Sequence, residues 1–183
     1  MRIIGGRARG TVIQAPEGLD TRPTLDRVRE NIYNLLQFKV PGARVLDLFA
    51  GSGAMAFESL SRGAAHAVLV DRDKGAIACI RKNGEKLRML DRSTILSCDW
   101  QEAVRHLTAA GEKFDLIFLD PPYALQDLSP VTEALLPLMA EGCTLAVEHR
   151  AGQMPKFCNG LLLADQRRYG IAGVCLLRKA EKP

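Results

Sequence analysis

The chain has 183 residues, of which 47% are hydrophobic and 25% are charged, and its formal net charge at pH 7 is +4. These proportions exclude a disordered protein and fit one folded domain over residues 1–183 with a sizeable core. No apolar run approaches the roughly 20 residues of a membrane span, and the start "MRIIGGRARG" lacks the apolar centre of a secretory signal, so a cytoplasmic protein is expected.

The first 40 residues are predicted to form a hairpin and a helix that extend the domain. "RII" and "TVIQ" flank the glycine-rich "GGRARG", a pattern typical of two short strands around a turn. In "LDRVRENIYNLLQF" apolar residues recur at helical spacing, and Thr24 is expected to cap the helix. Seven basic residues face four acidic ones between positions 1 and 40, so +3 of the net charge lies here.

After "PG" at 41–42, predicted strands alternate with predicted helices. The strands are expected at 44–48, 67–71, 94–98, 116–120 and 144–148, and the helices at 54–62, 74–89, 101–110 and 128–140. The last segment, "GLLLADQRRYGIAGVCLLRK", indicates two strands around a turn near Gly170. The prediction is an α/β fold: a Rossmann-like, mostly parallel seven-stranded sheet that ends in an antiparallel hairpin.

Two features at the ends of predicted strands indicate a cofactor with an adenosine group. In "DLFAGSGAMA", Asp47 and the loop of Gly51, Ser52 and Gly53 stand between a strand and a helix, where backbone N–H groups can face a ligand. Asp71 follows Gly51 by 20 residues, a spacing that suits an acid accepting hydrogen bonds from ribose hydroxyls. Taken alone, Asp71 fits a solvated acid at a strand end equally well.

The stretch "FDLIFLDPPYALQ" ends a predicted buried strand with an acid, two prolines and a tyrosine. Two prolines remove two N–H donors and leave outward carbonyl acceptors beside the Asp120 carboxylate. Such a group can hold the exocyclic amine of a nucleobase while Tyr123 stacks on the base, which favours methyl transfer by positioning and electrostatics. The alternative interpretation of "PP" is a turn that merely ends the strand.

These motifs, in this order and one per successive strand, resemble the class I S-adenosylmethionine-dependent methyltransferases that act on amino groups. "MRIIGGRARG", "TRPTLDRVREN", "LDLFAGSGAMAFESLSRGA", "FLDPPYA" and "VEH" are similar to the bacterial small-subunit ribosomal RNA guanine-N2 methyltransferase family. The similarity spans nearly the whole chain. It implies S-adenosyl-L-methionine as cofactor and methylation of the exocyclic N2 amine of one guanine in small-subunit ribosomal RNA.

The resemblance also implies roles for individual residues. Gly51 and Gly53 would lie under the methionine part of the cofactor, Asp47 near its amino group, Asp71 at the ribose, and Asp99 with Trp100 around the adenine. Phe49, Ser52 and Arg72 complete the expected cofactor contacts. Asp120, Pro121, Pro122 and Tyr123 would form the catalytic site for the target base.

The basic N-terminal part is predicted to bind RNA phosphates through Arg7, Arg9, Arg22, Arg27 and Arg29. Alternatively, Arg27 and Arg29 pair with Asp26 or Glu30. No metal site is expected, because the three histidines lack metal-ligand spacing. The expected partner is ribosomal RNA or the small ribosomal subunit, bound by a monomer away from any membrane.

Three other functions remain open at the level of the sequence. The same motifs fit adenine-N6 methylation of DNA, although the chain has little room for a separate target-recognition domain. A nicotinamide-dependent oxidoreductase could use the glycine loop and Asp71, but it leaves "DPPY" without a role. A non-catalytic RNA-binding factor could retain the fold, and a measurement of activity would decide that question.

Overall fold

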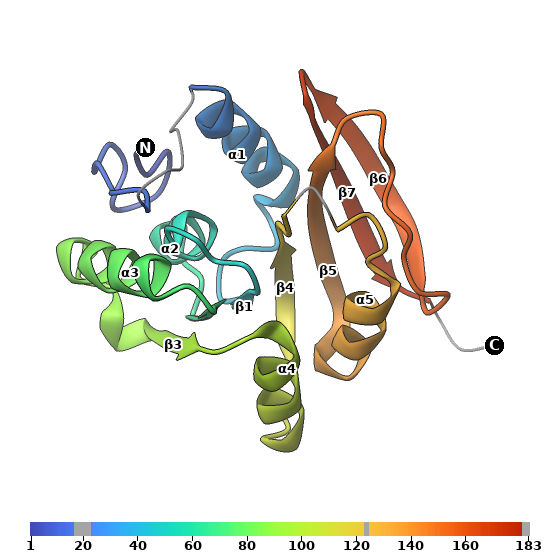
Figure 1. Cartoon of the computed structure of the whole chain (residues 1–183). Helices are drawn as coiled ribbons and strands as arrows, with labels where there is room; N and C mark the ends of the chain where they lie inside the picture. The colour runs from blue at the N-terminus through green and yellow to red at the C-terminus, as the bar shows by residue number, and fades with distance from the viewer. Residues whose placement is uncertain (17–22, 123–124, 181–183) are drawn as a thin grey trace.

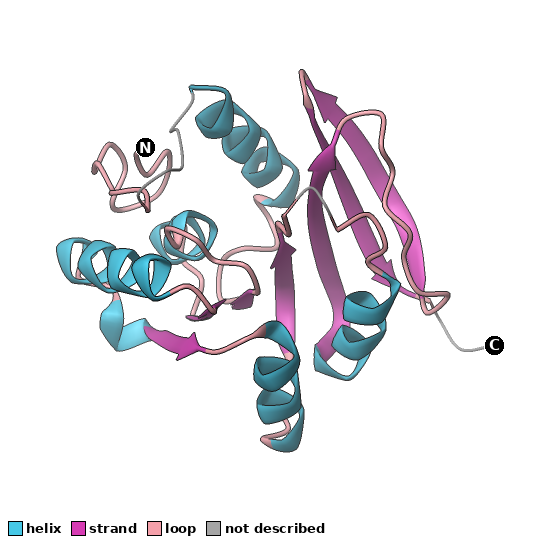
Figure 2. Cartoon of the chain, viewed as in Figure 1, coloured by secondary structure: helices cyan, strands magenta, loops and turns pink. Residues whose placement is uncertain are grey.

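The computed structural model describes residues 1–16, 23–122 and 125–180, and within them a seven-stranded sheet forms the centre (Figures 1 and 2). In spatial order the strands are β3 (Ser93–Ser97), β2 (His66–Asp71), β1 (Arg44–Asp47), β4 (Phe114–Leu119), β5 (Met139–Arg150), β7 (Ala172–Lys179) and β6 (Leu161–Tyr169). Strands β1 to β5 pair in parallel, whereas β7 pairs antiparallel with both β5 and β6. The predicted parallel sheet with an antiparallel end is confirmed.

Helices cover both faces of this sheet. Helices α1 (Pro23–Leu36), α2 (Ala54–Ser61) and α3 (Lys74–Leu87) share one apolar cluster with Val45, Leu69 and Phe118 of the sheet. Helices α4 (Trp100–Ala109) and α5 (Ser129–Leu135) share the opposite cluster with Leu46 and Leu119. Neighbouring residues of one strand enter different clusters because successive side chains of a strand point to opposite faces. Burial on both faces explains the consecutive apolar residues at the centres of β1, β2 and β4.

The order of the strands also fixes where a ligand can bind. The chain runs from β1 outward through β2 to β3, and then returns to place β4 on the other side of β1. The connections on the two sides of β1 therefore leave toward opposite faces, which opens a crevice beyond the carboxyl ends of β1 and β4.

The predicted boundaries were wrong at three places. Helix α1 begins at Pro23, so Thr24 lies inside the helix and is not its cap. The expected helix over 128–140 ends as α5 at Leu135, and the short 3₁₀ helix η2 (Leu136–Leu138) contains Pro137, which has no N–H for a continuing helix. Strand β5 consequently begins at Met139 instead of residue 144, and Met139 pairs with Phe114.

The N-terminal segment, residues 1–16, contains a shorter form of the expected hairpin. The antiparallel bridge between Arg2 and Val12 is flanked by hydrogen bonds from the Ile3 N–H to the Thr11 carbonyl at 3.0 Å and from the Ile13 N–H to the Met1 carbonyl at 3.1 Å. Ile3 and Ile13 are buried and belong to the same apolar cluster as α1 and α2. The segment is thus held by packing against helices. Among the described helices, none has the length and apolar character needed to cross a membrane.

Candidate active site

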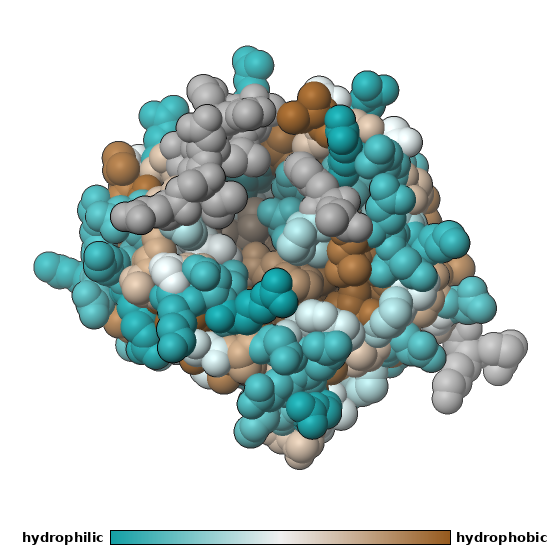
Figure 3. Space-filling model, in the orientation of Figure 1, coloured by the Kyte–Doolittle hydropathy of each residue, from teal (hydrophilic) through white to brown (hydrophobic). Residues whose placement is uncertain are grey.

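A cleft of about 920 Å³ lies beyond the carboxyl ends of the parallel strands. Figure 3 shows the molecule hollowed near the middle of this face, with apolar side chains inside the hollow. The volume is in the range of roughly 300–1,000 Å³ that small-molecule sites occupy. The predicted site residues that line it are Asp47, Phe49, Gly51, Ser52, Asp71, Arg72, Asp99, Trp100, Asp120, Pro121 and Pro122. The topology therefore brings these predicted residues together.

The glycine loop after β1 is fastened to the end of β2 by Asp71. One carboxylate oxygen of Asp71 accepts a hydrogen bond from the Gly51 N–H at 2.8 Å, and the other accepts from the Asp73 N–H at 2.9 Å. Each carboxylate oxygen can accept more than one hydrogen bond, so a pair of ligand hydroxyls can still donate to Asp71. Asp71 is therefore already oriented for a diol before a ligand arrives.

The two glycines of the loop have different positions. Gly51 lies at the cleft with φ of 55°, and a Cβ atom added there would meet nothing within 4 Å. Gly53 is not among the lining residues. Its φ is 76°, and an added Cβ would lie 2.6 Å from the Phe57 ring and 2.9 Å from Leu69. This close approach lets α2 begin directly against the sheet, and the place of Gly53 under a cofactor stays a prediction.

Asp47, at the end of β1, is a buried acid in the wall of the cleft. Its carboxylate accepts one hydrogen bond, from the Ala56 N–H at 3.2 Å. The pKa of Asp47 is raised to about 7, chiefly by burial; the Ala56 hydrogen bond opposes the rise, and the negative charges of Asp120 and Asp71 add to it. A cationic group in the cleft would stabilise the ionised form of Asp47.

Strand β4 ends at Leu119, and Asp120, Pro121 and Pro122 continue from it along the cleft. Asp120 faces the open cleft, yet desolvation by the protein atoms around its carboxyl raises its pKa to about 6. The Asp120 carboxyl is therefore largely ionised at neutral pH. Of the predicted catalytic residues, Tyr123 lies outside the described residues.

The predicted adenine contacts begin helix α4. Asp99 caps this helix, because its side chain accepts a hydrogen bond from the Glu102 N–H at 2.9 Å. Trp100 is half-buried and packs on the apolar cluster below α4 while lining the cleft. An indole fixed in this way offers an apolar surface beside the acid, a combination that suits a heteroaromatic ring.

The predicted RNA-binding arginines differ in their environments. Arg7, Arg9 and Arg27 are exposed, and Arg22 lies outside the described residues. Arg29 is buried at 4% exposure and donates to Asp26 at 3.0 Å, so its prediction as a surface RNA contact was wrong and the alternative pairing with Asp26 is confirmed.

A second groove, of about 940 Å³, runs between the N-terminal segment, α1 and the turn between β6 and β7. Arg2, Arg9 and Arg27 line it, together with Tyr169. This groove combines three arginines with one aromatic ring and with two acids, Asp26 and Glu30. It lies on the other side of Arg2 and α1 from the cleft, since Met1, Arg29 and Ile32 line the cleft.

The sequence analysis missed two buried polar residues that hold the walls of the cleft. Asn83 of α3 donates to the backbone oxygens of Gln14 and Ser52, both at 2.9 Å, and accepts from the Gln14 N–H at 2.8 Å. Glu58 of α2 is fully buried and binds the N-terminal segment. A polar residue within the apolar face of a predicted helix was the available signal for both.

Comparison with known proteins agrees with this arrangement. The family model described as "Conserved hypothetical protein 95" matches residues 1–178. The putative rRNA methyltransferase YlbH of Bacillus subtilis is 36% identical over 98% of this chain and 99% of its own length. Ribosomal RNA small subunit methyltransferase D of Escherichia coli is 38% identical over 67% of this chain and 60% of its own length.

Solved structures show the same fold. The putative methyltransferase yhhF from Escherichia coli superimposes with a TM-score of 0.83 at 30% identity, covering 100% of this chain and 99% of that one. The fold also matches SMU.776, a putative methyltransferase complexed with SAH, with a TM-score of 0.70 at 15% identity over 81% of this chain and 48% of that one. The relatives from Bacillus subtilis and Escherichia coli are both named as ribosomal RNA methyltransferases. Because the family model matches residues 1–178, the chain belongs to the "Conserved hypothetical protein 95" family.

Proposed function

We propose that the protein is an S-adenosylmethionine-dependent methyltransferase that modifies the exocyclic N2 amine of a guanine in small-subunit ribosomal RNA. The observation that carries the proposal is that one cleft holds Asp120, Pro121 and Pro122 together with Asp47, Asp71 and the glycine loop. The names of the relatives in Bacillus subtilis and Escherichia coli support ribosomal RNA as the substrate.

The cofactor part of the cleft has the donors and acceptors that S-adenosylmethionine requires. Asp71 accepts hydrogen bonds from the ribose hydroxyls, and Asp99 with Trp100 holds the adenine. Asp47 accepts from the cationic amino group, which offsets the cost of burying its own charge. When bound, the cofactor supplies an electrophilic methyl group on a positively charged sulfur.

The Asp120 end of the cleft orients the target amine. The lone pair of an exocyclic guanine amine is shared with the ring, so the amine is a weak nucleophile. Asp120 and the Pro121 carbonyl accept hydrogen bonds from the two N–H groups of the amine and direct its lone pair toward the methyl carbon, while Tyr123 stacks on the base. As the new N–C bond forms, the electron pair of the S–C bond remains on sulfur and the amine loses one proton to Asp120 or solvent. Positioning and electrostatic stabilisation account for such catalysis.

RNA reaches the cleft along the basic surface. Arg7, Arg9 and Arg27 contact phosphates, and the groove beside Tyr169 takes nucleotides that flank the target. A base in a loop or bulge can enter without breaking a pair, whereas a paired base must first be flipped out.

The test is transfer of labelled methyl from S-adenosylmethionine to unmethylated small-subunit RNA, to partly assembled small subunits and to duplex DNA, followed by digestion to identify the modified base. We expect N2-methylguanine in a ribosomal substrate and none in DNA. Replacing Asp120→Ala should abolish transfer while S-adenosylhomocysteine still binds. Incorporation only into DNA, as N6-methyladenine, would overturn the substrate, and cofactor binding without any incorporation would favour a binding role.

A further inference from the structure

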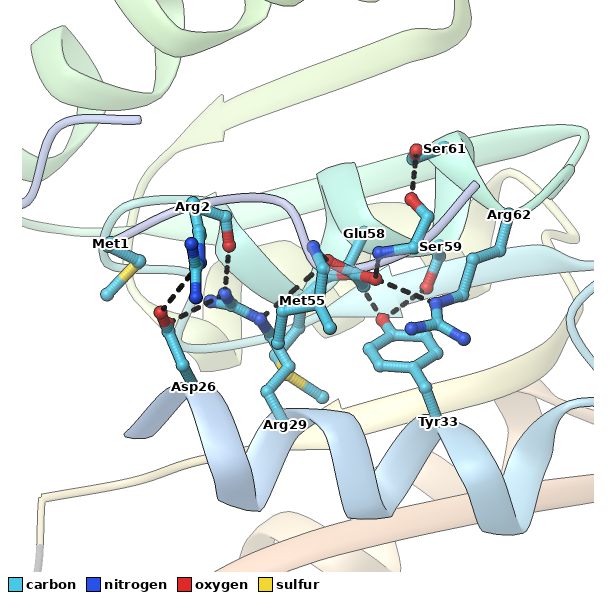
Figure 4. Close-up of polar contacts among 12 residues, drawn as sticks. Met1, Arg2, Asp26, Arg29, Tyr33, Met55, Glu58, Ser59, Ser61 and Arg62 are labelled. Atoms are coloured by element: carbon cyan, nitrogen blue, oxygen red, sulfur yellow. Dashed lines mark hydrogen bonds and ion pairs between the residues drawn. The ribbon is translucent and has the colours of Figure 1, made fainter. Parts of the chain in front are cut away.

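Glu58, in the middle of α2, is a fully buried carboxylate whose two oxygens bind the N-terminal segment (Figure 4). One oxygen accepts a hydrogen bond from the Ile4 N–H at 2.7 Å, and the other accepts from the Gly5 N–H at 2.7 Å. The Arg62 guanidinium donates to the second oxygen, also at 2.7 Å. A buried carboxylate is costly unless its charge and lone pairs are satisfied. Two of the groups that satisfy Glu58 are backbone N–H groups of residues more than 50 positions earlier.

The two glycines of "IIGG" allow the segment to lie directly on the end of α2. A Cβ atom on Gly6 would lie 2.0 Å from the Ser61 carbonyl oxygen, and one on Gly5 would lie 2.5 Å from the Arg62 guanidinium carbon. The Ser61 hydroxyl donates to the Gly5 carbonyl at 2.6 Å and accepts from the Ala8 N–H at 2.9 Å. The contact is therefore a close, specific fit of backbone against helix.

The position of this segment shapes the cleft. Met1, Ala15 and Pro16 line the cleft beside the glycine loop. The Ser52 hydroxyl of that loop lies 3.3 Å from the Met1 sulfur, and Asn83 joins the backbone of Gln14 to that of Ser52. Met1 thus contacts the glycine loop directly and Gln14 is joined to it through Asn83, while Glu58 binds Ile4 and Gly5 between them.

The turn of the same segment carries Arg7 and Arg9, whose side chains are exposed. The Arg7 N–H donates to the Ser61 carbonyl at 2.9 Å, next to the contacts that Glu58 makes. One fixed piece of backbone therefore connects the cofactor wall with the basic turn.

We propose that Glu58 is a positioning residue that holds residues 1–16 so that Met1 closes the cofactor cleft while Arg7 and Arg9 face RNA. The inference rests on the proposed function, since it takes S-adenosylmethionine and RNA as the two ligands. Glu58 touches neither ligand; apart from the segment it pairs with Arg62 and, at 3.8 Å, with Arg29, which also lines the cleft.

The direct test replaces Glu58→Gln, which keeps the shape but places an N–H₂ group against backbone N–H donors. We expect the Kd for S-adenosylhomocysteine, measured by titration calorimetry, and the Kd for small-subunit RNA each to rise by about tenfold. The KM for S-adenosylmethionine should rise while kcat at saturating cofactor and RNA stays within about twofold. The double variant Arg7→Glu, Arg9→Glu should weaken RNA binding and leave the Kd for S-adenosylhomocysteine unchanged.

A matched control separates positioning from general loss of stability. Leu135 of α5 is fully buried in the cluster on the opposite face of the sheet, so Leu135→Ala should lower the Tm without moving the N-terminal segment. We expect this variant to bind S-adenosylhomocysteine with the wild-type Kd. Equal weakening in Leu135→Ala and Glu58→Gln would overturn the positioning role.

A measurement on the wild-type protein decides the question even where a variant does not fold. Trypsin cleaves after Arg7 and Arg9 when the segment leaves α2, so saturating S-adenosylhomocysteine should slow this cleavage severalfold. An unchanged cleavage rate, or wild-type cofactor affinity in Glu58→Gln, would overturn this inference while leaving the proposed function intact. A wild-type protein that binds no S-adenosylhomocysteine would overturn both.

Discussion

Replacing the buried acid Asp47→Asn should stabilise the unliganded protein, and the gain should grow with pH. Burial raises the pKa of Asp47 from its ordinary value of 3.8 to about 7. Because the folded-state pKa lies above the unfolded one, this group's contribution to stability is complete below about pH 4 and is lost as the pH rises through about 7. Asparagine stays neutral throughout, and its side-chain oxygen can still accept from the Ala56 N–H.

The pKa difference sets the size of the effect. One pKa unit corresponds to about 1.4 kcal/mol, so the carboxyl of Asp47 lowers the free energy of unfolding by about 2 kcal/mol at pH 5 and by about 4 kcal/mol at pH 8. The gain from Asp47→Asn should therefore be larger at pH 8 than at pH 5 by about 2–3 kcal/mol. Contributions from ionisable groups distant from Asp47 are shared by both proteins and cancel in this difference, whereas the repulsion between Asp47 and its neighbours Asp120 and Asp71 is part of the effect.

Urea unfolding of both proteins at pH 5 and pH 8 measures the gain directly. The exposed acid Asp91 provides the control, because Asp91→Asn should give the same small change at both pH values. A gain from Asp47→Asn that does not depend on pH would refute the assignment of a raised pKa. The same variant should bind S-adenosylmethionine more weakly, since it lacks the charge that meets the cationic amino group.

Gly53→Ala should lower the free energy of unfolding by about 3 kcal/mol, because it adds a clash with Phe57 to a strained φ. Gly51→Ala should lower it by about 1–2 kcal/mol and should mainly weaken cofactor binding. Urea unfolding measures the stability and calorimetry measures the binding, and equal losses of stability in the two variants would contradict the difference in packing. Asn83→Ala should lower the free energy of unfolding, measured in urea, by about 2–4 kcal/mol because it leaves backbone groups of Gln14 and Ser52 unpaired. A loss below about 1 kcal/mol would show that water replaces the side chain. In a pH series of methyl transfer, kcat/KM should fall about tenfold per pH unit below about pH 6 as Asp120 of the free enzyme becomes protonated, and the residual activity of Asp120→Asn should lack that step.

The sheet was predictable because most of its strands contain short apolar runs separated by amphipathic helices, and the central parallel strands β1, β2 and β4 are buried on both sides. The predicted boundaries were wrong where the local sequence pattern favours one element and pairing with a distant strand favours another. The apolar residues after Leu135 continue a helical pattern, but Pro137 stops the helix and pairing with Phe114 extends β5 back to Met139. The "GGRARG" turn suggested a ladder, whereas Glu58 takes two of the N–H groups near its start.

The candidate site was predictable to the extent that it lies at the ends of strands. Asp47, Asp71 and Asp120 each lie at the carboxyl end of a predicted parallel strand, and such ends share one edge of a sheet. The buried positions of Arg29 and Glu58 were not predictable, since the partners that stabilise a buried charged side chain can lie far away in the sequence. Asn83 accepts a hydrogen bond from the N–H of Gln14, which lies 69 positions earlier, and a local sequence pattern cannot predict a contact between residues so far apart.

The place of α1 in the fold has a consequence for how the chain folds as it is synthesised. Helix α1 precedes every strand, yet its apolar face shares a cluster with Phe118 of β4, Ala146 of β5 and Val174 of β7, and the ring of Tyr33 lies 5.8 Å from that of Phe118. At about 5–20 residues per second, the ribosome adds β7 roughly 7–30 s after α1 emerges. During that interval the helix has only its early neighbours to cover it, so nascent chains that stop before β7 should bind hydrophobic dyes and chaperones through α1.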